Sequence, residues 1–434
     1  MKGIAYNVSA LIIEKVLVTF ILMASNIVVI RYLGAESFGL LSLFQVYLAL
    51  ITVVTEFGVR RVYTAQKSVR RELIIFRETF YMKVFIAIVM IAAFLILVYF
   101  TDINKYYLFL VIIFIVSPWE TYSYHFEANL RNDLLVKIRV SITLSLAIIR
   151  IALCLIKADI SLLMLSFVLN YVITNLCCYI FAKKYKFKPL KLKGKIKRIK
   201  IKKYILSRSF FFWISVLAVQ LNMRTDQILL STIAGAASVG IYAGAYKLVE
   251  QLMGIPSILA NVLLPHISRN VQGDKDKYLF DIYRISMLVS LPICATLFVL
   301  APYILPALLG KEFLKSVGIF EVLISALPIL VVVNISGLYY SIFKLEKYAL
   351  FRNVFGLIVS IILNYIFIKS YGAIGAAISV FISYTLLAYV FEWVLPVTRK
   401  NAKLKFLALL SIFNIKTYQE IFAYVFQKIK KSRT

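Results

Sequence analysis

The sequence has few of the residues that most enzymes use for catalysis or metal binding. It contains two histidines and four cysteines among 434 residues. Neither His125 nor His266 has an acidic residue or a cysteine at metal-ligand spacing. All four cysteines lie in apolar stretches without a CxxC motif: Cys154, Cys177, Cys178 and Cys294. We therefore expect no metal, no cofactor and no disulfide, and interpret the cysteines as packing residues.

Acidic residues are also scarce, with 20 Asp and Glu against 50 Lys and Arg and a net charge of +30 at pH 7. Such an excess can indicate a nucleic-acid-binding protein, but here the basic residues are confined to short segments between apolar runs. Hydrophobic residues make up 62% of the chain, and its mean hydropathy is +0.88. These values predict an all-α integral membrane protein with no nucleic-acid partner.

Apolar windows of about 20 residues, the length that crosses ~30 Å of hydrocarbon, predict about twelve transmembrane helices. The windows are residues 8–30, 39–59, 80–100, 106–126, 138–156, 160–182, 209–233, 239–263, 285–308, 317–343, 350–368 and 374–396. Glu14 and Lys15 interrupt the first window and no small-residue cleavage site follows it, so we interpret it as a span rather than a signal peptide.

Most Lys and Arg fall on one side of the membrane when all these windows cross it. The positive-inside rule makes that side the cytoplasm and places both termini there. The turns on the opposite side are short, which leaves no room for an extracellular catalytic domain.

The basic segment from residue 183 to 208 carries thirteen Lys and Arg and no acidic residue, and it divides the windows six and six. We expect an N-lobe over residues 1–182, this cytoplasmic linker over 183–208, a C-lobe over 209–396 and a tail over 397–434. The tail mixes apolar residues with lysines, which predicts amphipathic helices on the anionic cytoplasmic face rather than a thirteenth span.

One short motif occurs in both halves. GAESFG (residues 34–39) and GAASVG (residues 235–240) share four of six residues at an offset of 201. Because each half has an even number of spans, the halves enter the membrane in the same orientation, related by a pseudo-twofold axis along its normal. Each motif falls at the outside turn between the first two helices of its half, where glycine allows positive φ or close helix approach. We favour this structural interpretation over ligand contact.

Ionisable residues inside the apolar windows are the candidate functional groups, because each costs on the order of 2.5 to 3.5 kcal/mol at a helix centre unless it faces protein or water. Arg224 and Asp226 fall in the seventh window, where residues two apart do not face each other, so each needs another partner. Lys247 and Glu250 fall in the eighth window at i,i+3 and can form an ion pair, which is as good an interpretation as a ligand role.

The first window adds Glu14 and Lys15, and the fifth adds Arg150, for which snorkelling to the outside is the alternative. The windows also contain uncharged or acidic polar residues: Asn26, Gln45, Glu56, Glu120, Gln220, Asn222, Asn334 and Asn364. Together these residues predict a hydrated interior cavity with Arg and Lys in its lining.

Three stretches resemble the polysaccharide flippases of the MOP exporter superfamily, the translocases of O-antigen or capsule repeat units. They are RYLGAESFGLLSLFQVYLALITVVTEFGVRR, NMRTDQILLSTIAGAASVGIYAGAYKLVEQL and YGAIGAAISV. The resemblance implies two six-helix lobes in a V shape, as in MATE transporters, with a cationic central cavity and alternating access. It also implies the bacterial inner (plasma) membrane.

The resemblance further implies a substrate, an undecaprenyl-diphosphate-linked oligosaccharide carried from the cytoplasmic to the outer leaflet. The partners would be membrane lipids, a polysaccharide polymerase and other assembly proteins. Arg224 and Lys247, then Lys15 and Arg150, are the expected cavity residues for diphosphate and sugar. Asp226, Glu250 and Glu14 are expected either to couple H⁺ or Na⁺ or to pair with basic residues.

Three alternatives compete with a flippase. A multidrug or cation antiporter of the same superfamily would favour an acidic or aromatic cavity. A major-facilitator transporter would carry a glycine-aspartate-basic signature after the second span, which RRVYTAQKSVRRELIIFRE lacks. A membrane-embedded glycosyltransferase or polymerase would need a sizeable outside loop. We therefore expect a transporter rather than an enzyme.

Overall fold

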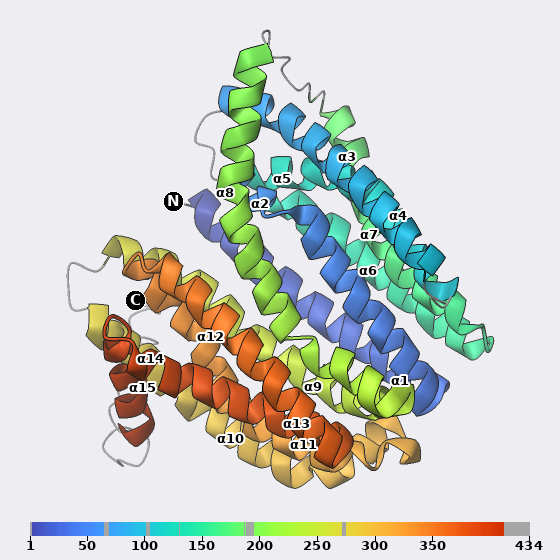
Figure 1. Cartoon of the computed structure of the whole chain (residues 1–434), viewed down its shortest axis with the longest axis vertical. Helices are drawn as coiled ribbons and strands as arrows, with labels where there is room; N and C mark the ends of the chain where they lie inside the picture. Colours follow the sequence, from blue (N-terminus) through green and yellow to red (C-terminus); the bar gives the residue numbers. More distant parts are fainter. Residues whose placement is uncertain are drawn as a thin grey trace.

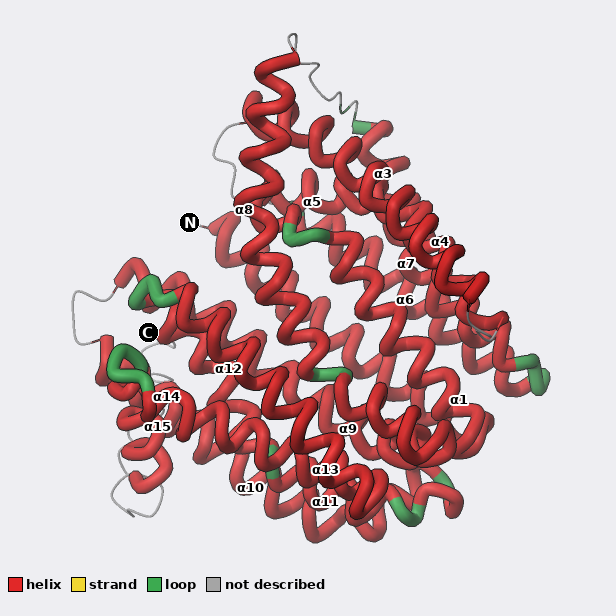
Figure 2. The backbone as a smooth tube through the Cα atoms, in the orientation of Figure 1, coloured by secondary structure: helices red, strands yellow, loops and turns green. Residues whose placement is uncertain are grey.

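The computed structural model describes residues 2–64, 69–100, 105–129, 131–185, 187, 195–270 and 275–411. Within these ranges, the side chains of residues 2–16, 69–74, 195–198 and 253–270 are not described. Every regular element in the described part is helical, which confirms the all-α prediction (Figure 2).

The first half of the chain forms an N-lobe. Its elements are α1 (Lys2–Glu56), α2 (Val59–Thr64), α3 (Val69–Phe100), η1 (Lys105–Leu110), α4 (Val111–Val116), η2 (Ser117–Glu120), α5 (Thr121–Ala128), α6 (Asn132–Leu155) and α7 (Ile160–Lys184). The span Lys105–Ala128 departs from α-helical geometry at η2, which is a 3-10 helix. Pro118 lies in η2 and cannot donate a backbone hydrogen bond.

The second half forms a C-lobe, to which α8 (Lys195–Asn222) leads. The later elements are α9 (Thr225–Asn270), α10 (Lys275–Leu309), η3 (Lys311–Phe313), α11 (Ser316–Ser325), α12 (Leu327–Ile342), α13 (Glu346–Thr385), η4 (Leu386–Val390), α14 (Phe391–Val394) and α15 (Arg399–Ser411). The helix α8 packs against α13 as well as α1, so it runs between the lobes. The predicted linker of residues 183–208 is therefore helical from Lys195 onward.

Nine described helices are long and apolar enough to cross a membrane, or ten with the pair α11 and α12, which is bent by 45°. Three of the long helices, α1, α9 and α13, each contain one glycine outside helical φ and ψ: Gly34, Gly235 and Gly372. At such a residue two helices meet, and Figure 1 shows the chain of α1 turning back on itself. The chain is a multi-pass membrane protein, while the count of twelve spans stays a prediction.

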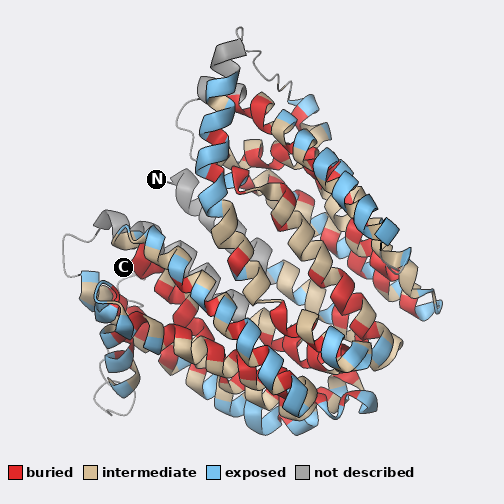
Figure 3. Cartoon of the chain, viewed as in Figure 1, coloured by how far each residue is buried: buried red, intermediate tan, exposed pale blue. Residues whose placement is uncertain are grey.

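Exposed residues follow the outer helices of the molecule, which include α3 (Figure 3). This is expected of helices that face lipid. On α3, Phe85, Tyr99 and Phe100 are between 67% and 85% exposed. An apolar surface of this extent is typical of a membrane-facing helix.

The two lobes form a V (Figure 1). They diverge toward the end where α8 starts and where the N-terminal part of α1 lies. We call this end of the molecule the basic end. They meet at the opposite end, which carries the turns at Gly34, Gly235 and Gly310 and which we call the turn end. A hydrophobic cluster there joins both lobes, with the rings of Phe38 and Phe313 6.5 Å apart in edge contact.

The two copies of the repeated motif pack directly on each other at the turn end. A Cβ atom built on Gly39 would lie 1.9 Å from the carbonyl oxygen of Ala236, and one on Gly240 would lie 1.7 Å from that of Ala35. No real Cβ atom approaches another atom so closely, so glycine is required at both positions. Gly34 (φ 69°) and Gly235 (φ 79°) have the positive φ predicted for outside turns.

Two polar contacts add to this closure, and we call them the outer latch. The Arg31 guanidinium donates to the carbonyl of Ala307 at 2.9 Å. The backbone N–H of Ala35 donates to the Glu312 carboxylate at 3.2 Å. A carboxylate of the C-lobe therefore caps the helix that begins after Gly34 in the N-lobe.

The helix α15 packs against α10 and the end of the C-lobe (Figure 1). Its Lys405 is fully buried and lies 2.7 Å from Glu392, which is also fully buried. Asn401 donates to the same carboxylate at 2.7 Å. The helix α15 is thus a short helix after the last span that packs against protein through a buried ion pair, and the amphipathic cytoplasmic tail stays a prediction. Residues 412–434 lie outside the described part.

Candidate functional site

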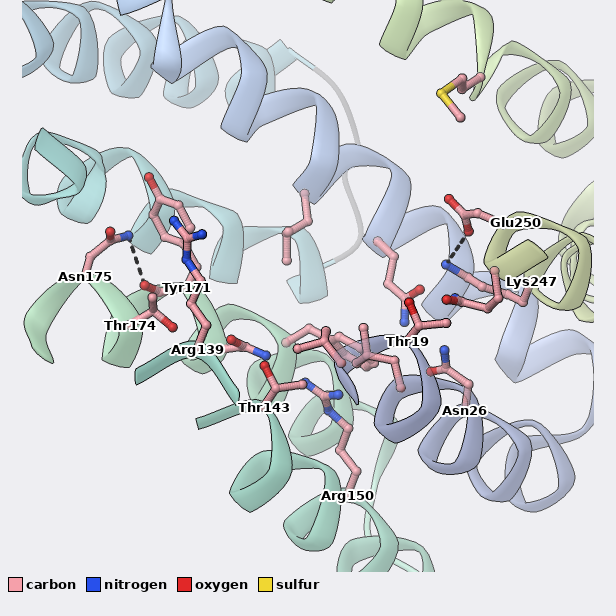
Figure 4. Close-up of a pocket in the computed structure, with 18 of the residues that line it drawn as sticks. Thr19, Asn26, Arg139, Thr143, Arg150, Tyr171, Thr174, Asn175, Lys247 and Glu250 are labelled. Carbon is pink, nitrogen blue, oxygen red and sulfur yellow. Dashed lines mark hydrogen bonds and ion pairs between the residues drawn. The ribbon is translucent and has the colours of Figure 1, made fainter. Parts of the chain in front are cut away.

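A cavity of about 750 Å³ lies between the lobes. Its walls come from α1, η2, α5, α6 and α7 on the N-lobe side and from α9 and α12 on the C-lobe side, with Met223 between α8 and α9. Four of the predicted polar residues line it: Asn26, Gln45, Glu120 and Asn334. Figure 4 shows the labelled polar side chains of this cavity directed into a common space.

The cavity lining carries five charged residues, three of them basic: Arg139, Arg150, Lys247, Glu120 and Glu250. Most other polar lining residues are amides or alcohols, which include Thr19, Thr143, Asn170, Thr174 and Asn175. A lining of this kind offers hydrogen bonds to sugar hydroxyls and positive charge to phosphate.

On the C-lobe wall, Glu250 binds both basic residues that the sequence placed there. Its carboxylate lies 2.7 Å from the Arg224 guanidinium and 3.4 Å from the Lys247 ammonium. Lys247 and Glu250 line the cavity, whereas Arg224 is not among its lining residues. The predicted i,i+3 pair of Lys247 and Glu250 is present (Figure 4). Glu250 also supplies the separate partner that Arg224 needs.

The position of Arg224 follows from a break in the chain. The helix α8 ends at Asn222, Met223 and Arg224 form a turn, and α9 begins at Thr225. The seventh window is therefore two helices rather than one. The turn at Gly235 then brings Glu250 back to the level of Arg224, 26 residues along the chain.

Asp226 does not line the cavity and is 2% exposed, within the C-lobe. One carboxylate oxygen accepts the backbone N–H of Gln227 at 2.7 Å, and the other accepts the hydroxyl of Tyr242. Within the described part of the chain, its hydrogen-bond partners are thus neutral groups. Gln227 accepts a hydrogen bond from Ser42 of the N-lobe at 2.9 Å, so this region also joins the lobes.

On the N-lobe wall, Arg150 lines the cavity and is fully buried. Its Nε donates to the Ser166 hydroxyl at 2.9 Å, and the Phe167 ring centre lies 3.7 Å from its Cζ. The snorkelling alternative is therefore wrong, because protein covers this guanidinium. The helix α1 includes Glu14 and Lys15, but their side chains lie outside the described part.

A sequence-family model that matches most of the chain identifies the family. A family model described as "Polysaccharide biosynthesis protein" matches residues 28–318. The chain belongs to the polysaccharide biosynthesis protein family. Among curated proteins, none matches this sequence.

Solved structures of a lipid II flippase and of MATE transporters share the fold of this chain. The lipid II flippase MurJ in an inward closed conformation aligns over 94% of this chain and 92% of its own, with a TM-score of 0.70 at 15% identity. A multidrug resistance MATE family transporter aligns in its inward-facing conformation over 89% and 95%, with a TM-score of 0.65 at 15% identity. An outward-facing MATE structure aligns over 92% and 96%, with a TM-score of 0.58 at 15% identity.

Two further cavity groups have partners that the sequence did not predict. Glu120 lies 2.6 Å from the fully buried ammonium of Lys83 and accepts the Tyr171 hydroxyl at 3.2 Å. Arg139 lies 3.1 Å from Glu127. A helical period would have found Arg139, since Arg139, Thr143 and Arg150 share one face of α6. Lys83 and its partner Glu120 are 37 residues apart in the chain, and they meet because α3 packs against η2. Their pairing could not be predicted from the spacing of residues within one helix.

Proposed function

We propose that this protein is a flippase that carries undecaprenyl-diphosphate-linked oligosaccharide units from the cytoplasmic to the outer leaflet of a bacterial inner membrane. The observation that carries the proposal is the polar, partly basic cavity between the lobes, in a chain of the polysaccharide biosynthesis protein family. Membrane lipids, the polysaccharide polymerase and other assembly proteins are the partners that this role implies.

The chemistry of the substrate explains why such a cavity is useful. A sugar and diphosphate head cannot enter hydrocarbon without losing its hydration, whereas a polyprenyl tail is stable there. The cavity supplies water-like hydrogen bonds through amides and alcohols, and positive charge through Arg139, Arg150 and Lys247. The head then crosses in the cavity while the tail stays in lipid.

The direction of opening also supports the proposal. The lobes are closed at the turn end by the paired glycine motifs and the outer latch. The positive-inside rule makes the basic end cytoplasmic, so this state faces inward and is ready to load. Alternating access would open the turn end and release the unit outside.

The alternative of a multidrug or cation antiporter receives less support. The two cavity carboxylates, Glu120 and Glu250, both have basic partners within 3.4 Å or less. They are therefore poor sites for an organic cation. Asp226, whose two oxygens accept only from neutral donors in the described part, is the group that we propose to bind a coupling H⁺ or Na⁺.

Depletion of the protein tests this function. We expect an undecaprenyl-linked repeat unit to accumulate on the cytoplasmic side and surface polysaccharide to fall. Lipid analysis of the depleted cells and of cells that express the protein again measures both effects. Unchanged lipid intermediates together with unchanged surface polysaccharide would show that the protein has another role.

Two variants test the basic C-lobe wall. Arg224→Ala and Lys247→Ala should insert normally but lose export, because each removes one of the two cations around Glu250. Lys369→Ala is the matched control, since it removes an exposed lysine near the turn at Gly372. Full export by a protein in which both basic residues are replaced would exclude the two ion pairs of Glu250 from substrate handling.

A further inference from the structure

A second cavity of about 270 Å³ lies within the N-lobe, at the ends of α5, α6 and α7. It shares no lining residue with the cavity between the lobes. Three of its lining residues, Asn129, Arg131 and Tyr185, each lie one residue outside a candidate membrane span. We call this cavity the boundary pocket, because it lies where three spans reach one surface of the bilayer.

The boundary pocket lies at the depth of lipid headgroups. Lys183 and Lys184, in the last turn of α7, are exposed, and Tyr185 is 52% exposed. Lysine side chains reach toward the membrane surface, and tyrosine rings are enriched there. The helix α5, which contributes to the pocket, lies toward the basic end of the N-lobe (Figure 1). The positive-inside rule makes that end cytoplasmic, and anionic lipids give the cytoplasmic leaflet a negative surface potential.

Arg131 supplies the positive charge of the boundary pocket. Its Cζ lies over the Tyr185 ring, 4.5 Å from the ring centre. No carboxylate of the described residues lies within ion-pair distance of its guanidinium. The backbone N–H of Arg131 donates to the carbonyl of Phe126 at 2.9 Å, which fixes where this side chain begins. The N–H groups of a guanidinium held over a ring lie at its edge, so they can donate to a phosphate.

His125 adds an oriented imidazole to the wall of the same pocket. Its ring centre lies 3.8 Å from that of Phe187, whose backbone N–H donates to the carbonyl of Ala182 at 3.1 Å. The Asn129 amide nitrogen donates to the His125 carbonyl at 2.8 Å and lies 3.1 Å from its Nδ1. Because that nitrogen is a donor, Nδ1 accepts, and the proton of the neutral imidazole is assigned to Nε2. The pocket thus combines aromatic rings with N–H donors of two basic side chains.

The size and chemistry of the boundary pocket suit a phosphate with a short polar substituent. Sites for drug-sized ligands measure about 300 to 1,000 Å³, and this pocket is smaller. Basic pockets between transmembrane helices on the cytoplasmic side are a known mode of headgroup recognition. We propose that the boundary pocket binds the headgroup phosphate of an anionic phospholipid, with Arg131 as the main contact and His125 as a second donor. The acyl chains stay in the bilayer beside the lobe. This site is independent of the substrate that the cavity between the lobes carries.

Native mass spectrometry of the full chain, released from detergent that contains phosphatidylglycerol or phosphatidylcholine, tests the pocket. The unchanged protein should retain phosphatidylglycerol better, because only this lipid carries a net negative charge. Arg131→Gln should reduce the retention of phosphatidylglycerol about fivefold, since an arginine near an anionic membrane surface contributes about 1 kcal/mol. Equal retention of the two lipids by the unchanged protein would overturn the proposal.

Lys137→Gln is the matched control, because Lys137 is another exposed cation of α6 and does not line the pocket. It should retain phosphatidylglycerol as the unchanged protein does. An equal loss in the Arg131 and Lys137 variants would mean that the lipid responds to net charge alone, and the pocket would be wrong.

His125→Phe gives a second measure of the same site, since it keeps a ring beside Phe187 and removes the imidazole donor. We expect a smaller loss of phosphatidylglycerol than in Arg131→Gln. Both side chains to be replaced lie at the surface or partly exposed, so the melting temperatures without phospholipid should stay close to that of the unchanged protein. Full retention in both variants would overturn the proposal.

Glycerol 1-phosphate distinguishes a phospholipid from a soluble phosphate compound, because it carries the phosphate without acyl chains. A large excess should be needed to displace phosphatidylglycerol from the unchanged protein, since the acyl chains keep the lipid headgroup next to the pocket. Displacement by an equimolar amount would assign the pocket to a soluble phosphate compound and would overturn the lipid as its occupant.

Discussion

The two glycine turns that begin the repeats have nearly the same backbone but different surroundings. Gly34 has φ 69° and ψ −178°, and Gly235 has φ 79° and ψ 174°. Near Gly34, a Cβ atom would lie 2.6 Å from the Glu312 carboxylate, whereas nothing lies within 4 Å of one on Gly235. The two copies of the motif thus form a symmetric contact with each other. Glu312 of the C-lobe adds a polar contact to the copy at Gly34 only.

At the turn end, one set of residues sets how closely the lobes approach, and another set adds polar contacts between them. Gly39 and Gly240 each approach the other lobe's backbone, so they set how closely the lobes can meet. Glu312 and Arg31 add polar contacts that break when the lobes part. We therefore expect glycine substitutions at the contact to block closure and latch substitutions only to weaken it.

The largest effect should come from Gly39→Ala or Gly240→Ala. The added Cβ would overlap the carbonyl oxygen of the other lobe, and overpacking of this kind costs about 1 to 3 kcal/mol. Spin labels at Lys157 and Lys369, both exposed, would report the distance between the lobes after the four native cysteines are replaced. We expect pulsed-EPR distances to shift to longer values.

Gly337→Ala is the matched control for these variants, because a Cβ atom there has nothing within 4 Å. It should leave the distances unchanged. Unaltered distances in Gly39→Ala would mean that the motif contact does not limit closure.

Gly34→Ala and Gly235→Ala should each increase the distance between the lobes by a smaller amount, and the increase should differ between the two variants. Both glycines occupy a φ and ψ region that is essentially restricted to glycine, so alanine costs about 1 to 3 kcal/mol at either position. Only at Gly34 must the Glu312 carboxylate also move away from the Ala35 N–H. We expect Gly34→Ala to open the turn end more in the same distance measurement. Equal distances in the two variants would show that the latch adds nothing.

Glu312→Ala should have a modest effect. A carboxylate at a helix N-terminus contributes about 0.3 to 1 kcal/mol, and this one acts across the two lobes. Glu36→Ala is the control, since it removes an exposed carboxylate of the same turn. We expect a small increase in the open population for Glu312→Ala alone. The latch interpretation fails if Glu36→Ala opens the turn end as much.

The smallest effect on lobe closure should come from replacing Asp159, the N-cap residue of α7, because its capping contacts lie within the N-lobe. Asp159 accepts the backbone N–H of Ser161 at 3.0 Å at the start of α7, and the Ser161 hydroxyl and N–H lower its pKa below the usual 3.8. Because the folded pKa is lower, the cap contributes stability above pH 3.8 and loses it as the pH falls through the folded pKa. Asp159→Ala should cost about 1 kcal/mol at pH 7, and less as the carboxyl is protonated.

Thermal unfolding at pH 7 and pH 3 measures this cap, with Asp159→Asn as the control that keeps a capping oxygen without a charge that titrates. Lobe distances should not change in either variant. A shift of these distances would link the cap to closure and would remove the distinction between lobe stability and lobe contact.

Local patterns predicted much of the fold and part of the site. The repeated motif predicted the turns at Gly34 and Gly235, because both a positive φ and close helix approach require glycine. The i,i+3 spacing predicted the pair of Lys247 and Glu250. Both features depend on residues within one turn of a helix or on two aligned copies of one motif.

Contacts between distant segments could not be predicted in this way. The bond of Arg224 to Glu250 needs the predicted reversal at Gly235 and also the break after Asn222, which hydrophobic periodicity does not show. Glu392 and Lys405 pair only because α15 folds back onto the C-lobe. Membrane windows show which residues are inside the bilayer, but helix packing decides which of them meet.

The buried pair of Glu392 and Lys405 sets a lower limit on the length of chain that can fold. A protein shortened just after the last span would keep Glu392 but lose Lys405 and Asn401, and would leave a carboxylate within 3.5 Å of Arg352 without its nearest cation. Loss of one partner of such a pair typically costs about 3 to 5 kcal/mol, a large part of the stability of a typical domain. Affinity tags and reporter fusions should therefore be placed after Ser411, the last described residue of α15.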